Sequence, residues 1–188
     1  MKISALGDLF QDRVENSFKR LKEKVPAVGL SMTPDTIFHG FDAFEKVIAS
    51  DINMVILASP PHFRPKHLKA AVAAGKHVFM EKPVAVDPVG IRSVIATSKL
   101  ASDKGLSIVA GTQRRHQAHY LEIMKRVRNG DLGDLVAGQC YWNMGALWIS
   151  RAMDNWVGWK TRDWSDMEWQ IRNWLFPVSY THLRAHET

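Results

Sequence analysis

The chain has 188 residues, of which 46% are hydrophobic and 23% charged, and its formal net charge is +6. These proportions are those of an ordinary globular protein, and the length suffices for one domain and part of another. No apolar run approaches the length that spans a bilayer, so a membrane protein is not expected. The single cysteine, Cys140, excludes an intrachain disulfide and fits a reducing compartment.

The positive net charge raises the question of an anionic partner, such as a nucleic acid, a phosphate group or a cofactor. The basic residues do not gather into one block, because those of segment 12–24 stand beside Glu15 and Glu23, as on a solvated helix face. A nucleic-acid-binding function therefore rests on the net charge alone. We expect neither a nucleic acid nor a membrane as partner.

Strands and helices alternate along the first part of the chain. Short apolar runs predict strands, and apolar periodicity with capping residues predicts helices. In chain order the expected elements are strand 2–8, helix 12–24, helix 41–50, strand 54–59, helix 64–75, strand 77–80, helix 88–104 and strand 107–112. The continuous apolar run at 54–59 further predicts a strand that is covered on both faces.

This alternation predicts βαβ units around a parallel sheet, a fold that binds ligands at the carboxyl ends of its strands. Polar residues stand at the carboxyl ends of four of the expected strands, namely Asp8, Ser59, Glu81 with Lys82, and Gln113. One polar residue at a strand end means little. Four on the same edge of a sheet indicate a binding site.

The chain changes character after residue 113. Segment 119–134 predicts a helix and a turn, segment 135–144 predicts a longer strand, and all seven tryptophans fall between residues 142 and 174. We therefore expect an α/β fold class, with a partial parallel-sheet domain over residues 1–113 and the start of an α+β domain over residues 114–176. Residues 177–188 break the pattern abruptly and look like a non-native tail.

Three stretches carry a family resemblance: ASPPHFRPKHLKAAVAAGKHVFMEKPVAVD at 58–87, GTQRRH at 111–116 and NGDLGDLVAGQCYWN at 129–143. They resemble the Gfo/Idh/MocA family of NAD(P)-dependent oxidoreductases, and the Glu-Lys-Pro directly after a buried strand is the most specific signal. The resemblance implies a Rossmann-type domain and an enzyme that transfers a hydride between a nicotinamide cofactor and a sugar, polyol or related substrate. The whole protein is expected to be a homo-oligomer.

The resemblance also implies roles for individual residues in binding the adenosine half of the cofactor. Asp8 resembles the acidic residue that accepts hydrogen bonds from the ribose, and its carboxylate would repel a 2′-phosphate, which favours NAD over NADP. Asp8 could also cap the next helix or close an Asx turn, and the two roles can coexist. Ser59, Pro60 and His62 resemble the loop that flanks the dinucleotide, with a plain structural turn as the alternative.

Lys82 is the expected catalytic residue, because alcohol oxidation needs a base for the hydroxyl proton while hydride leaves carbon. A free lysine, with a pKa of roughly 10.4, is a poor base at neutral pH, but burial and a nearby positive charge favour the neutral form. A surface lysine at a strand end is the alternative.

The resemblance also implies roles for neighbouring residues. Glu81 resembles the residue that contacts the nicotinamide ribose, and Gln113 and Arg114 resemble residues that line the nicotinamide and substrate pocket. The Lys82–Pro83 peptide bond is a candidate for the cis form.

Trp169 and Arg172 stand where the family often has a Trp-Arg pair near the cofactor. The other tryptophans suit core packing or an interface better than stacking on a carbohydrate. His116 and His119 have no carboxylate or cysteine nearby in the sequence, so we expect no metal site.

The sequence departs from the family pattern at both ends. No G-x-G-x-x-G phosphate loop occurs, and the family's first strand, glycine loop and first helix would precede residue 2. The family's catalytic histidine and its neighbouring aspartate would follow residue 176. We therefore expect an internal segment of a longer enzyme that, by itself, binds NAD weakly or not at all and turns nothing over.

The alternative to an enzyme is a non-catalytic nucleotide- or ligand-binding protein on the same scaffold. The two would be told apart by whether the whole protein carries the glycine loop and the histidine. The first residues lack the long apolar core of a signal peptide. We expect a cytoplasmic location unless preceding residues supply an export signal.

Overall fold

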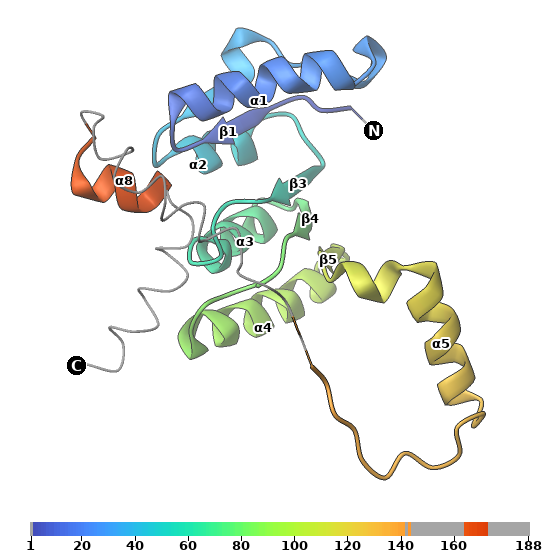
Figure 1. Cartoon of the computed structure of the whole chain (residues 1–188). Helices are drawn as coiled ribbons and strands as arrows, with labels where there is room; N and C mark the ends of the chain where they lie inside the picture. Colours follow the sequence, from blue (N-terminus) through green and yellow to red (C-terminus); the bar gives the residue numbers. More distant parts are fainter. Residues whose placement is uncertain (1, 142, 144–163, 173–188) are drawn as a thin grey trace. The chain divides into compact units, whose positions relative to one another are not determined.

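The computed structural model describes residues 2–141, 143 and 164–172. The chain divides into two compact units, Met1–Gly111 and Thr112–Thr188. The division expected from the sequence, after residue 113, lies close to this point. Figure 1 shows both units in the colours of the sequence.

The first unit alternates strands and helices along the chain, as the sequence predicts (Figure 1). Its elements are β1 (Leu6–Asp8), α1 (Gln11–Lys24), β2 (Ile37–His39), α2 (Ala43–Ala49), β3 (Met54–Leu57), α3 (Arg64–Ala73), β4 (His77–Met80), α4 (Pro88–Asp103) and β5 (Ile108–Ala110). Strands β1, β3 and β5 are shorter than expected, and β2 was not predicted at all. At the start of α4, the Asp87 side chain accepts the N–H of Gly90 at 2.6 Å, which confirms the expected N-cap.

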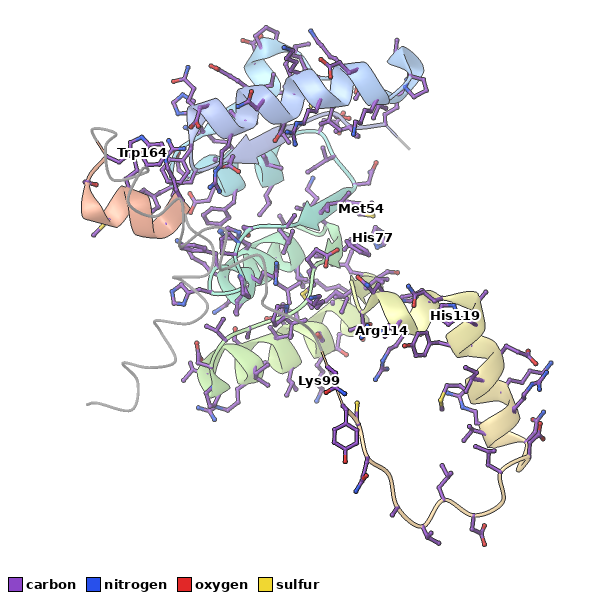
Figure 2. All side chains as sticks on the ribbon, in the orientation of Figure 1. Met54, His77, Lys99, Arg114, His119 and Trp164 are labelled. Carbon is purple, nitrogen blue, oxygen red and sulfur yellow. The ribbon has the colours of Figure 1, made fainter. Side chains whose placement is uncertain are left out.

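Every strand pair in this unit is parallel. The strands form two separate sheets, with the orders β1–β2 and β3–β4–β5. Within the second sheet, Met54 of β3 stands opposite His77 of β4, and both are labelled in Figure 2. Neither β1 nor β3 has a strand on its other edge among the described residues. Dinucleotide-binding folds have the strand order 3-2-1-4-5-6, in which strand 1 lies between strands 2 and 4. We interpret β1 as strand 2 and β3 as strand 4 of this order, so that their free edges are the ones that strand 1 pairs with.

Helices α1 and α2 pack against the β1–β2 sheet. Val14 is the buried residue of α1, at 1% exposure. On β1, Gly7 lets α2 lie close to the strand, because a Cβ there would come within 2.8 Å of Val47 Cγ2 and 3.3 Å of the Ala43 carbonyl oxygen. A larger residue at this position would push α2 away from the sheet.

Helices α3 and α4 pack against each other, and α3 also packs against β3 and β4. The core cluster joins inward-facing strand residues to apolar residues of three helices. Its buried members are Ile48, Val55, Leu57, Leu68, Ala71, Val72, Val78, Met80, Val94 and Ala101. Burial of these side chains from water is the main stabilising contribution to the unit.

The expectation that segment 54–59 is covered on both faces is wrong in this structure. Val55 and Leu57 are buried, whereas Met54 and Ile56, on the opposite face, are 40% and 55% exposed. Val109 of β5 is also exposed, at 43%. A continuous apolar run shows that both faces tolerate burial, but it does not show which elements are present to cover them.

The second unit contributes a 3₁₀ turn, η3 (Gln113–His116), and the helices α5 (Ala118–Arg128) and α8 (Asp166–Arg172). The turn expected after α5 is present, with Gly130 and Gly133 both at positive φ. The strand expected at 135–144 is not formed over 135–141, which is exposed and irregular, and residues 142 and 144 lie outside the described residues. An apolar run forms a strand only where a partner edge is available.

Among the helices that the structure describes, none is long and apolar enough to cross a membrane.

Candidate functional site

The most distinctive local structure is the turn that follows β4, formed by Glu81, Lys82 and Pro83. The N–H of Glu81 donates to the carbonyl oxygen of Leu57 at 3.0 Å, which extends the β3–β4 pairing by one residue. The Lys82–Pro83 peptide bond is cis, as the sequence suggested. Glu81 is half-buried, whereas Lys82 and Pro83 are exposed. The turn therefore continues the rigid sheet and presents Lys82 to its surroundings.

The carboxylate of Glu81 lies directly against the backbone of Gly111, at the carboxyl end of β5. A Cβ at position 111 would come within 2.7 Å of Glu81 Oε2 and 2.9 Å of Oε1. Gly111 is buried, and its N–H donates to the Met80 carbonyl oxygen at 2.7 Å. The Glu81 Oε2 atom also accepts the N–H of Lys82 at 3.2 Å. The missing side chain at position 111 thus provides the space in which the carboxylate is held.

A methyl group at position 111 should displace this carboxylate. We expect Gly111→Ala to lower the free energy of unfolding of the whole protein by about 1–3 kcal/mol, the usual cost of overpacking. Urea unfolding measures the change. Gly138→Ala is the control, because no atom lies within 4 Å of a Cβ at that exposed position. Equal stabilities of the two variants would show that the carboxylate is not confined against Gly111.

Arg64, the first residue of α3, contacts the same turn from the helix side. It is only 4% exposed, and its Nη1 donates a hydrogen bond to the carbonyl oxygen of Pro83. Its Nε is buried and has no hydrogen-bond partner in the described structure. Burial lowers the pKa of Arg64, and the negative charge of Glu81 raises it in part. The ordinary value for arginine is so high that the guanidinium stays charged.

Ser59, which follows β3, is paired with a histidine of α3. Its Oγ lies 3.2 Å from His67 Nδ1. The His67 ring stacks on Phe44 at 4.1 Å between ring centroids and on Phe63 at 6.1 Å. Burial, and to a lesser extent the charge of Lys66, lowers the pKa of His67 from 6.5 to about 4. His67 is therefore neutral at physiological pH.

This depressed pKa should make stability depend on pH. Because the folded state favours neutral His67, the unfolded chain binds more protons below its pKa of 6.5, and stability falls as the pH drops from 6.5 towards about 4. The full shift corresponds to about 3 kcal/mol, and partial solvent screening reduces the expected loss to roughly 1–2 kcal/mol. Urea unfolding of the whole protein at several pH values measures it. The variant His67→Phe keeps the ring stacking and removes the titrating group, so its stability should change less across this pH range. An equal pH dependence of the variant and the wild type would show that His67 is not the group responsible.

The sequence predictions did not include Arg64 or His67. The available signal was their position on α3, where Arg64 stands one turn before the fully buried Leu68. A charged residue on the same face of a helix as the buried apolar residues is unusual, and it indicates that the charge has a hydrogen-bonding or charged partner inside the protein.

The other predicted residues of the first unit lie at the expected strand ends. The Oδ1 atom of Asp8 accepts the N–H of Phe10 at 3.0 Å, so the Asx-turn alternative is formed, and the ribose role stays a prediction. The Pro60 carbonyl oxygen accepts the N–H of Phe63 at 3.0 Å within a tight turn. His62 is exposed and meets the Phe63 ring edge-on at 5.4 Å. The roles of Pro60 and His62 towards a dinucleotide also stay predictions.

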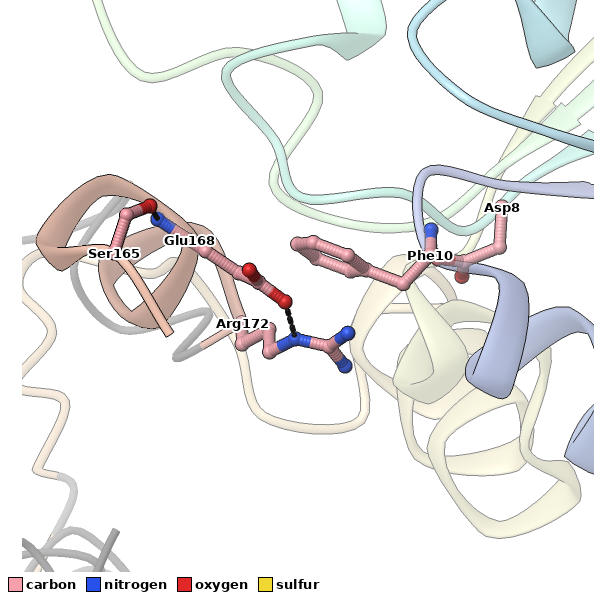
Figure 3. Close-up of polar contacts among 5 residues, drawn as sticks. All are labelled: Asp8, Phe10, Ser165, Glu168 and Arg172. Carbon is pink, nitrogen blue, oxygen red and sulfur yellow. Dashed lines mark hydrogen bonds and ion pairs between the residues drawn. The ribbon is translucent and has the colours of Figure 1, made fainter. Parts of the chain in front are cut away.

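The remaining predicted residues belong to the second unit. Gln113 and Arg114 lie in η3, and the Arg114 guanidinium stands 6.0 Å from the Tyr120 ring centroid. In α8, Arg172 Nε donates to Glu168 Oε1 at 2.8 Å, as Figure 3 shows. The Arg172 guanidinium also lies 4.4 Å from the ring centroid of Trp164.

Trp169 is part of α8, but its side chain lies outside the described residues. Cofactor contacts by Gln113, Arg114, Trp169 and Arg172 therefore stay predictions. Within the described parts of the chain, no three His, Cys, Asp or Glu residues gather as a metal site would require.

Parallel strands joined by helices, with a structured polar turn at a strand's carboxyl end, define a fold of the dinucleotide-binding class. Residues 15–111 match the Gfo/Idh/MocA model, described as an oxidoreductase family with an NAD-binding Rossmann fold. The chain belongs to this family. The resemblance stated from the sequence is confirmed.

Several relatives are named for their action on inositol. An inositol 2-dehydrogenase of Rhizobium meliloti is 29% identical over 50% of this chain and 27% of its own length. One of Agrobacterium fabrum is 34% identical over 68% of this chain and 34% of its own length. The match thus spans between about a quarter and a third of the length of these relatives.

Among solved structures, apo scyllo-inositol dehydrogenase of Lactobacillus casei is 26% identical, with a TM-score of 0.56 over 71% of this chain and 35% of that chain. The same enzyme with bound NAD(H) and scyllo-inositol has a TM-score of 0.58 over 93% of this chain and 48% of that chain, at 21% identity. The second likeness shows the fold alone.

Proposed function

We propose that the whole protein is an NAD-dependent oxidoreductase that transfers a hydride between the nicotinamide and a hydroxyl-bearing carbon of a sugar or polyol. Cyclic polyols of the inositol class are the first candidate substrates, because several relatives are inositol dehydrogenases. The observation that carries the proposal is the Glu81–Lys82–Pro83 turn at the carboxyl end of β4 in an NAD-binding family.

The acceptor groups of the first unit suit the hydroxyl groups of a dinucleotide. Asp8 at the end of β1 uses one carboxylate oxygen for the Phe10 N–H, and a carboxylate has lone pairs for further donors. Its negative charge favours a ribose with free hydroxyls over one with a 2′-phosphate. Glu81 offers a second carboxylate beside Gly111. These residues support NAD as the cofactor.

Lys82 is the residue that we assign to proton transfer. When bound, NAD supplies the group that accepts the hydride, and Lys82 Nζ takes the hydroxyl proton from the substrate. Lys82 is exposed in the described part of the chain. A bound substrate and cofactor would cover Lys82 further, and burial favours the neutral form in which a lysine accepts a proton.

The test is to assay the purified whole protein with NAD and with NADP against myo-inositol, scyllo-inositol and a panel of aldoses, following formation of the reduced cofactor. We expect turnover of at least one polyol or sugar, with NAD preferred over NADP. Binding of NAD without turnover of any of them would favour a non-catalytic binding protein. A protein that binds neither cofactor would exclude both an NAD(P)-dependent enzyme and a binding protein for these two nucleotides.

A further inference from the structure

We infer that Arg64 is a positioning residue for hydride transfer, whose buried guanidinium holds the Glu81–Lys82–Pro83 turn in the geometry that presents Glu81 and Lys82 to the ligands. The role in catalysis rests on the proposed function. The contacts that hold the turn do not depend on it.

The first observation is a long-range hydrogen bond to the turn. Arg64 begins α3, and its Nη1 donates to the carbonyl oxygen of Pro83, 19 residues later in the chain. Pro83 directly follows Lys82, so this bond fixes the backbone beside the proposed catalytic side chain. Proline has no N–H, so its carbonyl oxygen is the backbone group through which this residue can be held.

The second observation is the charge at this position. The other buried side chains of α3 are apolar, namely Leu68, Ala71 and Val72. A buried charge is costly unless it has a partner of opposite charge or several hydrogen bonds. The nearby negative group is Glu81, which favours the charged form of Arg64. Arg64 therefore acts on both ends of the turn, through the charge of Glu81 and the carbonyl oxygen of Pro83.

The third observation is that the turn is held on two sides. Arg64 contacts it from α3, while Gly111 provides the space for the Glu81 carboxylate at the end of β5. Between these supports, Lys82 has an exposed side chain on a fixed backbone. Such an arrangement is expected of a reactive group, because small misplacements of catalytic atoms cost large factors in rate.

Arg64 fills its buried position less well than an apolar side chain would. Arg64 Nε is buried without a hydrogen-bond partner in the described structure. An apolar side chain would avoid the cost of this unsatisfied donor. The hydrogen bond from Nη1 to Pro83 and the charge beside Glu81 are the interactions that an apolar side chain at this position could not make.

The activity test uses the variants Arg64→Met and Arg64→Lys. The control is Arg92→Met, because Arg92 is an exposed arginine on α4. In the whole enzyme, Arg64→Met should lower kcat by about 10–100-fold, the scale of a misplaced catalytic group. The KM for NAD should change by a smaller factor than kcat, because the guanidinium makes no proposed contact with the cofactor and affects it only through Glu81. Arg64→Lys restores a charge and a donor, so its kcat should lie between those of the wild type and Arg64→Met. Arg92→Met should match the wild type.

The second measurement, hydrogen exchange of backbone amides, does not require activity. The N–H groups of Glu81 and Gly111 are bonded to Leu57 and Met80 respectively. These two amides should exchange about tenfold faster in Arg64→Met than in the wild type and in Arg92→Met. Loss of the hydrogen bond from Arg64 to Pro83 should allow the turn to open locally. If Arg64→Met does not fold, Arg64→Gln replaces it, since glutamine keeps a donor and removes the charge.

Two results would overturn the inference. One is a kcat of Arg64→Met or Arg64→Gln within twofold of that of the wild type. The other is unchanged amide exchange at Glu81 and Gly111. If the wild-type protein is inactive, the proposed function fails, and the exchange measurement alone decides whether Arg64 holds the turn.

Discussion

Replacing Lys82 with methionine in the whole protein should lower turnover by about 10²–10⁴-fold, the usual effect of losing a general acid or base. Methionine keeps an unbranched side chain but can neither accept nor donate the proton at that position. The affinity for NAD should change far less, because the contacts proposed for the ribose and adenosine moieties come from other residues of the first unit, such as Asp8. Steady-state kinetics give kcat, and calorimetry gives the dissociation constant for NAD.

Lys99→Met is the matched control for this variant, because Lys99 is an exposed lysine on α4 (Figure 2). It should keep wild-type turnover. Unchanged turnover in Lys82→Met would remove Lys82 from the mechanism. An equal loss of NAD affinity and turnover would make Lys82 a binding residue instead of a proton-transfer residue.

Lys82→Met and Arg64→Met should also differ from each other in hydrogen exchange. The Lys82 side chain is exposed, so its removal should leave the Glu81 and Gly111 amides protected. Removal of the buried Arg64 should expose both amides. A catalytic residue and a positioning residue with similar losses of turnover would be distinguished by this one measurement.

Local sequence signals were sufficient for most elements of the first unit. The Asp87-Pro88 start of α4 and the glycines after α3 and α4 are strong helix boundaries, and the structure has Gly75 and Gly105 at positive φ. Segment 37–39 was missed because three residues are too few to display a strand's alternation. Its pairing with β1 is a property of the sheet, which a local pattern does not contain.

The Glu-Lys-Pro turn was predicted because its residues are consecutive and follow an apolar run. Its supports were not predicted, because they are distant in sequence. Nothing in the sequence distinguishes Gly111 from other glycines, and only the structure shows the Glu81 carboxylate packed against it. The spacing of Arg64 from Leu68 indicates that Arg64 is buried, but no local spacing identifies Pro83 or Glu81 as its partners.

A polypeptide limited to residues 1–176 should aggregate or unfold without a cooperative transition. The physical reason is the interruption between the two sheets, since β1 pairs only with β2 and β3 pairs only with β4 in the described structure. Unpaired strand edges recruit other chains. The exposed face formed by Met54, Ile56 and Val109 adds apolar surface at the same sheet.

Supplying the strand, glycine-rich loop and first helix of an intact family member before residue 2 should restore a monomer that unfolds cooperatively. The added strand would be parallel to β1 and β3 and would pair with both, which completes the 3-2-1-4-5-6 order. Size-exclusion chromatography and urea unfolding compare the two polypeptides. The completed polypeptide should show a single cooperative urea transition, which the shorter one should lack.

The matched control carries the same extension with prolines at alternate positions of the added strand. Proline cannot donate a hydrogen bond to a neighbouring strand, so this extension adds equal length and similar composition but cannot complete the sheet. It should leave the polypeptide aggregated. Rescue by the proline-containing extension would show that solubility, not strand pairing, limits the shorter chain. A monomeric residue 1–176 polypeptide that unfolds cooperatively without any extension would mean that β1 and β3 are natural edges and that β1 is not the second strand of the sheet.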